Sequence, residues 1–405
     1  MDRVQETVDR LYKTHFGKMV SSLFSLSKDI DLSMAEDIVH EGFSKALIHW
    51  RKDGIPANVS GWMYTVCRNS ALNQLKKSSH NHLTGSEPSY ENSFSESLIK
   101  DQHLRLLFIC SNPDLPPKSQ VVITLKYVVN LKVEAIAQLL GMTVDGIDKI
   151  LVRARQKIKV EGLLREPATS LALTSRLPVV HKIIYLIFNE GYKSSWGREV
   201  IREELCEEAL ILNNALLESG FASNETSALH ALMLFNAARI KSRFNTNGEI
   251  VELEKQDRLH WDNDLIALAT RFLQQSNDQV LSTYHIEASI AYLHCSAGSF
   301  ESTNWMLIVK LYEQLLLANP NPFVEVNYSI ALFHAGDRAR AFQILGTLQR
   351  HPFLHRNVLL TATLGKLHLL DGDGATAKAF LQRAVAETKL AAEKNLFTKL
   401  ILRCG

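Results

Sequence analysis

The chain has few cysteines, and they are widely scattered. Its 405 residues include five cysteines, and no two of them stand in a CxxC arrangement. This spacing argues against a zinc ribbon and against a disulfide framework, and it is typical of a reducing compartment. We therefore expect a cytoplasmic protein with no structural metal and no cofactor.

Long apolar runs and a strong net charge are also missing. No stretch approaches the ~20 apolar residues of a membrane-spanning helix, and the longest, VVHKIIYLIF, carries a lysine. The start, MDRVQETVDRLYKTHF, is charged and lacks the apolar core of a signal peptide. The net charge is 45 − 43 = +2, so any basic surface must be local. No membrane partner is expected.

What the chain does contain is helical pattern over nearly its whole length. Alternating strands with hairpin turns are not evident, and the sequence predicts an all-α protein. Four segments follow from the composition. They are a helical domain at 1–78, a Ser- and Asn-rich flexible linker at 79–97, a second helical domain at 98–165, and a long helical domain at 170–405.

The first segment predicts two amphipathic helices. SMAE at 33–36 predicts a capping box, in which Ser33 caps a helix and Glu36 reaches back to the cap. The second helix, GWMYTVCRNSALNQLKK, combines aromatic, amide and cationic groups. Such groups can stack on unpaired bases and hold phosphates. Taken alone, however, this helix is more simply explained as amphipathic with a solvated basic end.

The third segment predicts a helix-turn-helix. An apolar helix ends at Gly141, Thr143 can cap the next helix, and Ile147 and Leu151 can pack behind it. No acid falls between Lys149 and Lys159, so the second helix carries a local basic face. DNA binding in the major groove is favoured over an ordinary helical hairpin.

The last segment contains a weak repeat. GDRARAFQIL at 336 and GDGATAKAFL at 372 are offset by 36 residues, and SAGSF near 298 is a degenerate third copy. A period in the mid-thirties indicates helix pairs like those of TPR proteins. TPR-like concave surfaces usually bind peptides or proteins, so we expect such a partner.

No motif of a known enzyme class is present, including GxxxxGK[ST], HExxH and GxSxG. FNEGY at 188–192 and DRLHWD at 257–262 mix acids with aromatic residues. They could line a small-molecule pocket if they converged. Packed aromatics with capping or paired acids are the more common explanation, and we expect no enzymatic activity.

The order of these segments resembles a known family. AEDIVHEGF followed by GWMYTVCRNSALNQLKK is similar to region 2 of bacterial sigma factors of the extracytoplasmic-function group. LPPKSQVVITLKYVVNLKVEAIAQLLGMTVDGIDKILVRARQKIK is similar to their region 4. LRLLFICSNPDL, LPVVHKIIYLIFNEGYKSSWG and KQDRLHWD resemble the subgroup with a long TPR-like C-terminal extension, so the resemblance covers essentially the whole chain.

The resemblance implies two partners, core RNA polymerase and promoter DNA, and assigns residues to each. The polymerase-binding residues would be Asp37, His40 and Glu41. Those that recognise and melt the minus-10 element would be Tyr64, Arg68, Asn69, Asn73, Lys76 and Lys77, with Trp62 in the core. Those that bind the minus-35 element would be Thr143, Asp145, Asp148, Lys149, Arg153 and Arg155.

The chain departs from the family at several of these positions. The family usually has Gln where His40 stands, often has Asp where Asn73 stands and Arg-Arg where Lys76 and Lys77 stand, and commonly has Arg where Ile150 stands. Two other classes remain possible at this stage. One is a polymerase-independent helix-turn-helix regulator with a helical sensor or dimerisation domain. The other is a TPR-type scaffold.

Overall fold

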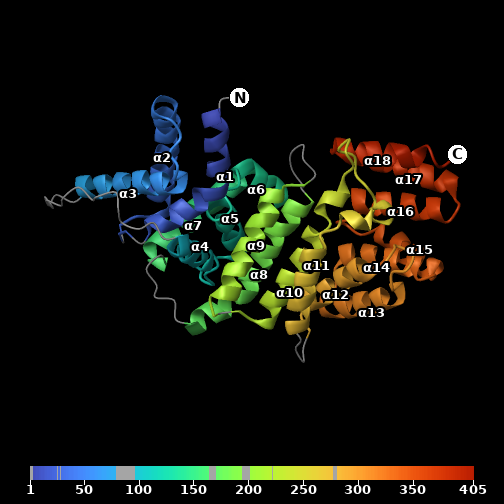
Figure 1. Cartoon of the computed structure of the whole chain (residues 1–405). Helices are drawn as coiled ribbons and strands as arrows, with labels where there is room; N and C mark the ends of the chain where they lie inside the picture. The colour runs from blue at the N-terminus through green and yellow to red at the C-terminus, as the bar shows by residue number, and fades with distance from the viewer. Residues whose placement is uncertain are drawn as a thin grey trace. The chain divides into compact units, whose positions relative to one another are not determined.

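The computed structural model describes residues 3–24, 26–27, 29–78, 96–163, 170–193, 201–220, 222–276 and 281–405. Within these ranges every regular element is a helix, apart from an isolated antiparallel bridge between Phe244 and Ile250 (Figure 1). The all-α prediction is therefore confirmed. The chain divides into two compact units. Unit 1 holds Met1–Gly191 and Arg202–Phe221, and unit 2 holds Tyr192–Ile201 and Ala222–Gly405.

Unit 1 contains the first nine α-helices almost entirely. These are α1 (Arg3–Leu23), α2 (Leu32–Asp53), α3 (Val59–Ser78), α4 (Glu96–Cys110), α5 (Pro117–Tyr127), α6 (Val133–Leu139), α7 (Val144–Val160), α8 (Ser170–Tyr192) and α9 (Glu203–Glu218). Helix α1 is the central element, because it packs against α2, α3 and α4. At Gly17 it approaches the main chain so closely that a Cβ atom would collide with the carbonyl oxygens of Tyr127 and Val128.

The start of α2 differs from the prediction. The N-cap is Asp31, whose Oδ1 accepts a hydrogen bond of 3.0 Å from the Met34 amide. Ser33 is an exposed residue of the first turn and Glu36 points away from the cap. Aspartate and serine are equally good N-caps, and Asp31, two residues before Ser33, takes the N-cap position of α2. The predicted capping box at Ser33 and Glu36 is therefore wrong. Glu36 is thereby free to face another helix.

The helices of unit 1 bracket the segment limits that the sequence predicts. Helix α3 ends at Ser78, and α8 begins at Ser170. Residues 79–95 of the predicted linker lie outside the described residues, and α4 already starts at Glu96. Helices α8 and α9 pack with unit 1 rather than with the later helices. The division into three helical domains and a linker stays a prediction.

Unit 2 is built from helices that pair with their neighbours along the chain. Its elements are α10 (Asn224–Ala237), η2 (Ile240–Arg243), η3 (Leu253–Lys255), η4 (Arg258–His260), α11 (Asn263–Gln275), α12 (Thr283–Ser296), α13 (Trp305–Ala318), α14 (Pro322–His334), α15 (Arg338–Leu348), α16 (Val358–Leu370), α17 (Gly374–Glu387) and α18 (Ala391–Ile401). The closest pairs are α10 with α11, α14 with α15, and α16 with α17.

The 36-residue repeat is visible in the turns of unit 2. Gly336 and Gly372 end α14 and α16 in the left-handed region, with φ of 97° and 90°. The next residues, Asp337 and Asp373, cap α15 and α17 through their carboxylates. Glycine supplies the positive φ and aspartate the N-cap. The repeated Gly-Asp pair therefore marks the turn within two TPR-like helix pairs, α14 with α15 and α16 with α17, at the predicted offset of 36 residues.

Candidate nucleic-acid interface

Helices α6 and α7 form the predicted helix-turn-helix. Gly141 follows α6 with φ of 62°, and Thr143 Oγ1 accepts a hydrogen bond of 3.1 Å from the Gly146 amide to cap α7. One face of α7 is buried, at Ile147, Leu151, Ala154 and Ile158. The opposite face is left for a partner, which is the arrangement that a recognition helix requires.

The exposed face of α7 carries most of the predicted minus-35 residues. Thr143, Asp145, Asp148, Lys149 and Arg153 are all exposed, and Ile150 is half-buried. Lys149 forms an ion pair of 2.7 Å with Asp145 one turn earlier. Arg153 has no ion-pair partner among the described residues. It is therefore the cation of this face that is most available to a phosphate.

Arg155 has a different environment from the other predicted minus-35 residues. Its guanidinium lies over the Tyr127 ring, 5.5 Å from the centroid, and its Nε donates a hydrogen bond to the Tyr127 hydroxyl. Its Nη2 lies 3.2 Å from Glu36 Oε2 in α2. In this conformation Arg155 is bound within unit 1. Sequence reasoning missed this contact, because the two partners are 119 residues apart.

Glu36 is the centre of a small ionic network between α2 and the helix-turn-helix region. It forms an ion pair of 2.8 Å with Lys126 and accepts a hydrogen bond of 2.9 Å from the Tyr127 hydroxyl. Burial alone would raise the pKa of the Glu36 carboxyl, but Lys126, Tyr127 and Arg155 outweigh it and hold the pKa below its ordinary value. Asp31 and Lys159, 2.8 Å apart, add a second, more exposed link.

The predicted minus-10 residues all lie on α3. Tyr64, Arg68 and Asn69 are half-buried, whereas Asn73, Lys76 and Lys77 are exposed toward the end of the helix. Trp62 is half-buried and packs on the buried Trp50, with ring centroids 5.3 Å apart, so its place in the core stays a prediction. Helix α3 thus presents aromatic, amide and cationic side chains in sequence along a single element.

The predicted polymerase-binding residues lie on α2. Asp37 and Glu41 are exposed, and His40 is half-buried with Nε2 3.0 Å from the Tyr12 hydroxyl oxygen. Glu41 accepts hydrogen bonds from Lys45 and Ser70, which lower the pKa of its carboxyl. The hydrogen bond from Ser70 joins α3 to α2. The candidate polymerase-binding surface on α2 and the candidate minus-10 surface on α3 therefore lie on two helices that are bonded to each other.

The two acids of DRLHWD have structural roles. Asp257 accepts a hydrogen bond from the Leu259 amide, and Asp262 caps α11 through the Leu265 amide. These acids therefore act as caps, as the more common explanation of DRLHWD predicts. Among the described residues no group of three or more His, Cys, Asp or Glu side chains could hold a metal ion.

Comparison with known proteins agrees with this geometry. The family model described as sigma-70 region 2 matches residues 11–81, and that described as sigma-70, region 4 matches residues 113–158. The ECF RNA polymerase sigma factor SigM of Bacillus subtilis (strain 168) is 24% identical over 156 residues, which are 38% of this chain and 93% of SigM. The chain belongs to the extracytoplasmic-function (ECF) group of sigma factors. It also carries a C-terminal extension beyond these two regions.

Further comparisons concern both the sigma regions and the extension. RNA polymerase sigma factor YlaC of B. subtilis (strain 168) is 21% identical over 164 residues, 38% of this chain and 91% of YlaC. Uncharacterized protein R00370 of Rhizobium meliloti (strain 1021) is 32% identical over 313 residues, 75% of this chain and 74% of that protein. A family of unknown function, DUF6596, matches residues 176–277. No solved structure matches the chain.

One further finding concerns membranes. In the part of the chain that the structure describes, no helix combines the length and the apolar character needed to cross a bilayer.

Proposed function

We propose that this ECF sigma factor binds core RNA polymerase through the exposed face of α2 and directs it to promoters. In this proposal Asp37, His40 and Glu41 contact the polymerase. Residues 1–78 act as region 2, 98–165 as region 4, 79–97 as the linker between them, and 170–405 as a regulatory domain. The polymerase supplies all covalent chemistry, so this chain needs no catalytic residue.

The observation that carries the proposal is the pairing of two different DNA-type surfaces in one chain. Helix α3 presents Tyr64 and Asn73 with the basic pair Lys76 and Lys77, which suits unstacked bases beside a phosphate backbone. Helix α7 presents an exposed, capped recognition face, which suits duplex DNA. A regulator that binds only closed duplex would have no use for the first surface.

A regulatory role of the extension is supported by its contacts within unit 1. The first helices of the extension, α8 and α9, pack beside α4 of region 4. Arg176 donates a hydrogen bond of 3.2 Å to the Phe108 carbonyl, and His103 lies 3.5 Å from Glu208. A change in α8 or α9 would therefore reach the helices that support α7. The later TPR-like helices offer a surface for a protein or peptide partner.

The test is transcription in vitro with purified core polymerase from the same host, the full chain and fragmented genomic DNA of that host. The proposal predicts initiation at a small set of start sites, used only when the chain is present and sharing elements near −10 and −35. Transcription that does not change on adding the chain, while the chain still binds specific duplex DNA alone, would favour the polymerase-independent regulator.

A further inference from the structure

Two arginines of unit 2 share one buried tryptophan. Arg258 lies 4.5 Å and Arg239 5.7 Å from the ring centroid of Trp261, which is 4% exposed. Tyr192, from the FNEGY motif, joins the same cluster, because Arg239 Nη2 lies 3.4 Å from its hydroxyl oxygen. The two motifs that the sequence analysis set apart thus meet here, through an arginine that belongs to neither of them.

Neither of these arginines forms an ion pair with a carboxylate of the described residues. Arg239 donates to Asn236 Oδ1 at 2.9 Å, and Arg258 donates to the carbonyls of His294 and Ala297 at 2.6 and 2.8 Å. Of the acids in DRLHWD, Asp262 caps a helix and Asp257 pairs with His260. The carboxylate that acts on Arg258 is that of Glu301, which is exposed and forms no ion pair with it. Two partly buried guanidinium groups that share one ring therefore have no direct ion-pair partner among the described residues.

Four nitrogen atoms of this cluster are buried without a hydrogen-bond partner among the described residues. They are Arg239 Nε, Arg258 Nη2, Trp261 Nε1 and His294 Nδ1. Buried N–H groups are almost always hydrogen-bonded, and arginine pairs are the usual means by which proteins hold carboxylates and phosphates. Arg239 Nε, Arg258 Nη2 and Trp261 Nε1 are N–H donors, and their chemistry points to an anion with several acceptor oxygens.

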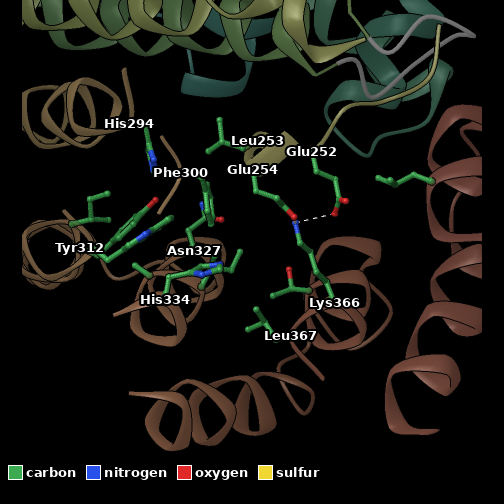
Figure 2. Close-up of a pocket in the computed structure, with 16 residues that line it drawn as sticks. Glu252, Leu253, Glu254, His294, Phe300, Tyr312, Asn327, His334, Lys366 and Leu367 are labelled. Atoms are coloured by element: carbon green, nitrogen blue, oxygen red, sulfur yellow. Dashed lines mark ion pairs between the residues drawn. The ribbon is translucent and has the colours of Figure 1, made fainter. Parts of the chain in front are cut away.

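A cavity of about 400 Å³ reaches this cluster at His294, which lines the cavity and whose carbonyl accepts a hydrogen bond from Arg258. The two arginines and Trp261 are not themselves among the residues that line it. Its walls include the aromatic side chains of Phe300 and Tyr312, both labelled in Figure 2. Trp305 also lines it, and the His294 ring lies 5.3 Å from the Trp305 ring. Sites for small organic ligands have this size and this mixture of apolar walls with few polar groups.

The cation inside the cavity is already neutralised. Lys366 forms ion pairs of 2.9 Å with Glu252 and 2.7 Å with Glu254. The dashed line between Lys366 and Glu252 in Figure 2 marks the first of them. His294 is uncharged near neutral pH, because burial and the charges of Arg239 and Arg258 lower its pKa to about 3. The positive charge still available to a ligand therefore lies on the two arginines and not in the cavity.

We propose that unit 2 binds an organic anion, with a carboxylate or phosphate held by Arg239, Arg258 and the Trp261 indole N–H, and with an aromatic-sized apolar body in the adjoining cavity. His294 stands at the junction of the two parts, where its free ring nitrogen can contact the ligand. This site does not depend on whether the chain binds polymerase.

The test uses the full chain with ¹⁵N-labelled tryptophan. The five tryptophans give five indole signals, and Trp261→Phe identifies the one from Trp261. The ligands are phenyl phosphate, phenylacetate, the neutral phenylacetamide and inorganic phosphate. We expect the Trp261 signal to move saturably with at least one aryl anion and to stay fixed with phenylacetamide. The aryl anion that binds more tightly identifies the head group.

Two variants and a matched control complete the test. Arg258→Gln should weaken binding of the preferred aryl anion at least tenfold by calorimetry. Lys399→Gln, which removes an exposed cation elsewhere in unit 2, should leave it unchanged. If Arg258→Gln does not fold, Trp261→Phe serves instead. It keeps an aromatic ring beside the arginines but removes the indole N–H, and it should still weaken binding several-fold. A Trp261 signal unmoved by millimolar aryl anions would overturn the site, and equal affinity for inorganic phosphate would overturn the role of the cavity.

Discussion

The Glu36 carboxylate in α2 lies 3.2 Å from the Arg155 guanidinium in α7. The contact joins region 2 to the recognition helix of region 4. Lys126 and Tyr127 also bind the Glu36 carboxylate, through an ion pair and a hydrogen bond. In this conformation an arginine expected at the minus-35 element is turned inward to a carboxylate. Binding of Arg155 to a phosphate would therefore compete with binding to Glu36.

Glu36→Gln tests this competition. Removing the negative charge should release Arg155 and raise the affinity of the free chain for promoter DNA at low salt, roughly three- to tenfold, or about 1 kcal/mol. Fluorescence anisotropy with a labelled duplex measures it. Glu6→Gln, at an exposed position of α1, removes the same charge away from α7 and should have no such effect. Equal affinities of the Glu36→Gln and unsubstituted chains would show that the ion pair does not restrain Arg155.

Arg153 and Arg155 should behave differently when each is replaced by alanine. Arg153 is exposed, so its loss should weaken binding to all duplex sequences and reduce the slope of log affinity against log salt by about one. The slope should change less for Arg155→Ala, because that side chain is bound to Glu36 in the free protein. Arg356→Ala, an exposed arginine of unit 2, is the control. A salt slope unaffected by Arg153→Ala would remove this residue from the DNA interface.

Replacing two helical glycines of unit 2 by alanine should change the free energy of unfolding in opposite directions. A Cβ at Gly365 in α16 would lie 2.7 Å from Leu381 Cγ in α17, whereas a Cβ at Gly346 in α15 would meet nothing. Gly365→Ala should therefore destabilise the chain by about 1–3 kcal/mol through overpacking. Gly346→Ala should stabilise it by roughly 0.5–1 kcal/mol, because alanine loses less backbone entropy in a helix. Urea unfolding measures both, and the same sign for the two variants would contradict this packing.

Two histidines of unit 2 should make the stability fall in mild acid. Burial lowers the pKa of His230 to about 4, and burial with nearby cations lowers that of His294 to about 3, from an ordinary 6.5. Their stabilising contribution is full above pH 6.5 and is lost as the pH falls toward these values, because only the unfolded chain binds the protons. Between pH 7 and pH 5 we expect a loss of about 1–2 kcal/mol per histidine. The free energy of unfolding of His230→Gln should fall less steeply with pH, and an unchanged slope would contradict the assignment.

Local turn chemistry explains which parts of the fold the sequence could predict. A helix cap or a positive φ depends only on the few residues of one turn. The positive φ of Gly141 and Gly336 and the N-caps at Thr143 and Asp337 therefore follow from residue type. The capping box at Ser33 failed for a related reason, because Asp31 offers an alternative cap of similar strength. Choosing between neighbouring caps depends on which face of α2 must be buried, and that is a property of the whole fold.

Long-range pairs could not be predicted in the same way. Nothing near Glu36 or Arg155 indicates that they meet, and their separation leaves no periodicity to detect. The arginine–tryptophan cluster shows an intermediate case. Its motifs could be singled out by composition, whereas Arg239, which joins Tyr192 to Trp261, stands in the segment NAARIKSR, which contains no recognisable motif.

The central claim is that this chain binds core RNA polymerase, and its affinity for purified core polymerase of its own host, without DNA, tests that claim most directly. We expect tight one-to-one binding, weakened at least tenfold by Asp37→Lys with Glu41→Lys and unchanged by Asp264→Lys at an exposed position of unit 2. Binding that ignores the charge reversals would move the interface away from α2. No binding by the full chain at micromolar concentration would contradict the proposed function.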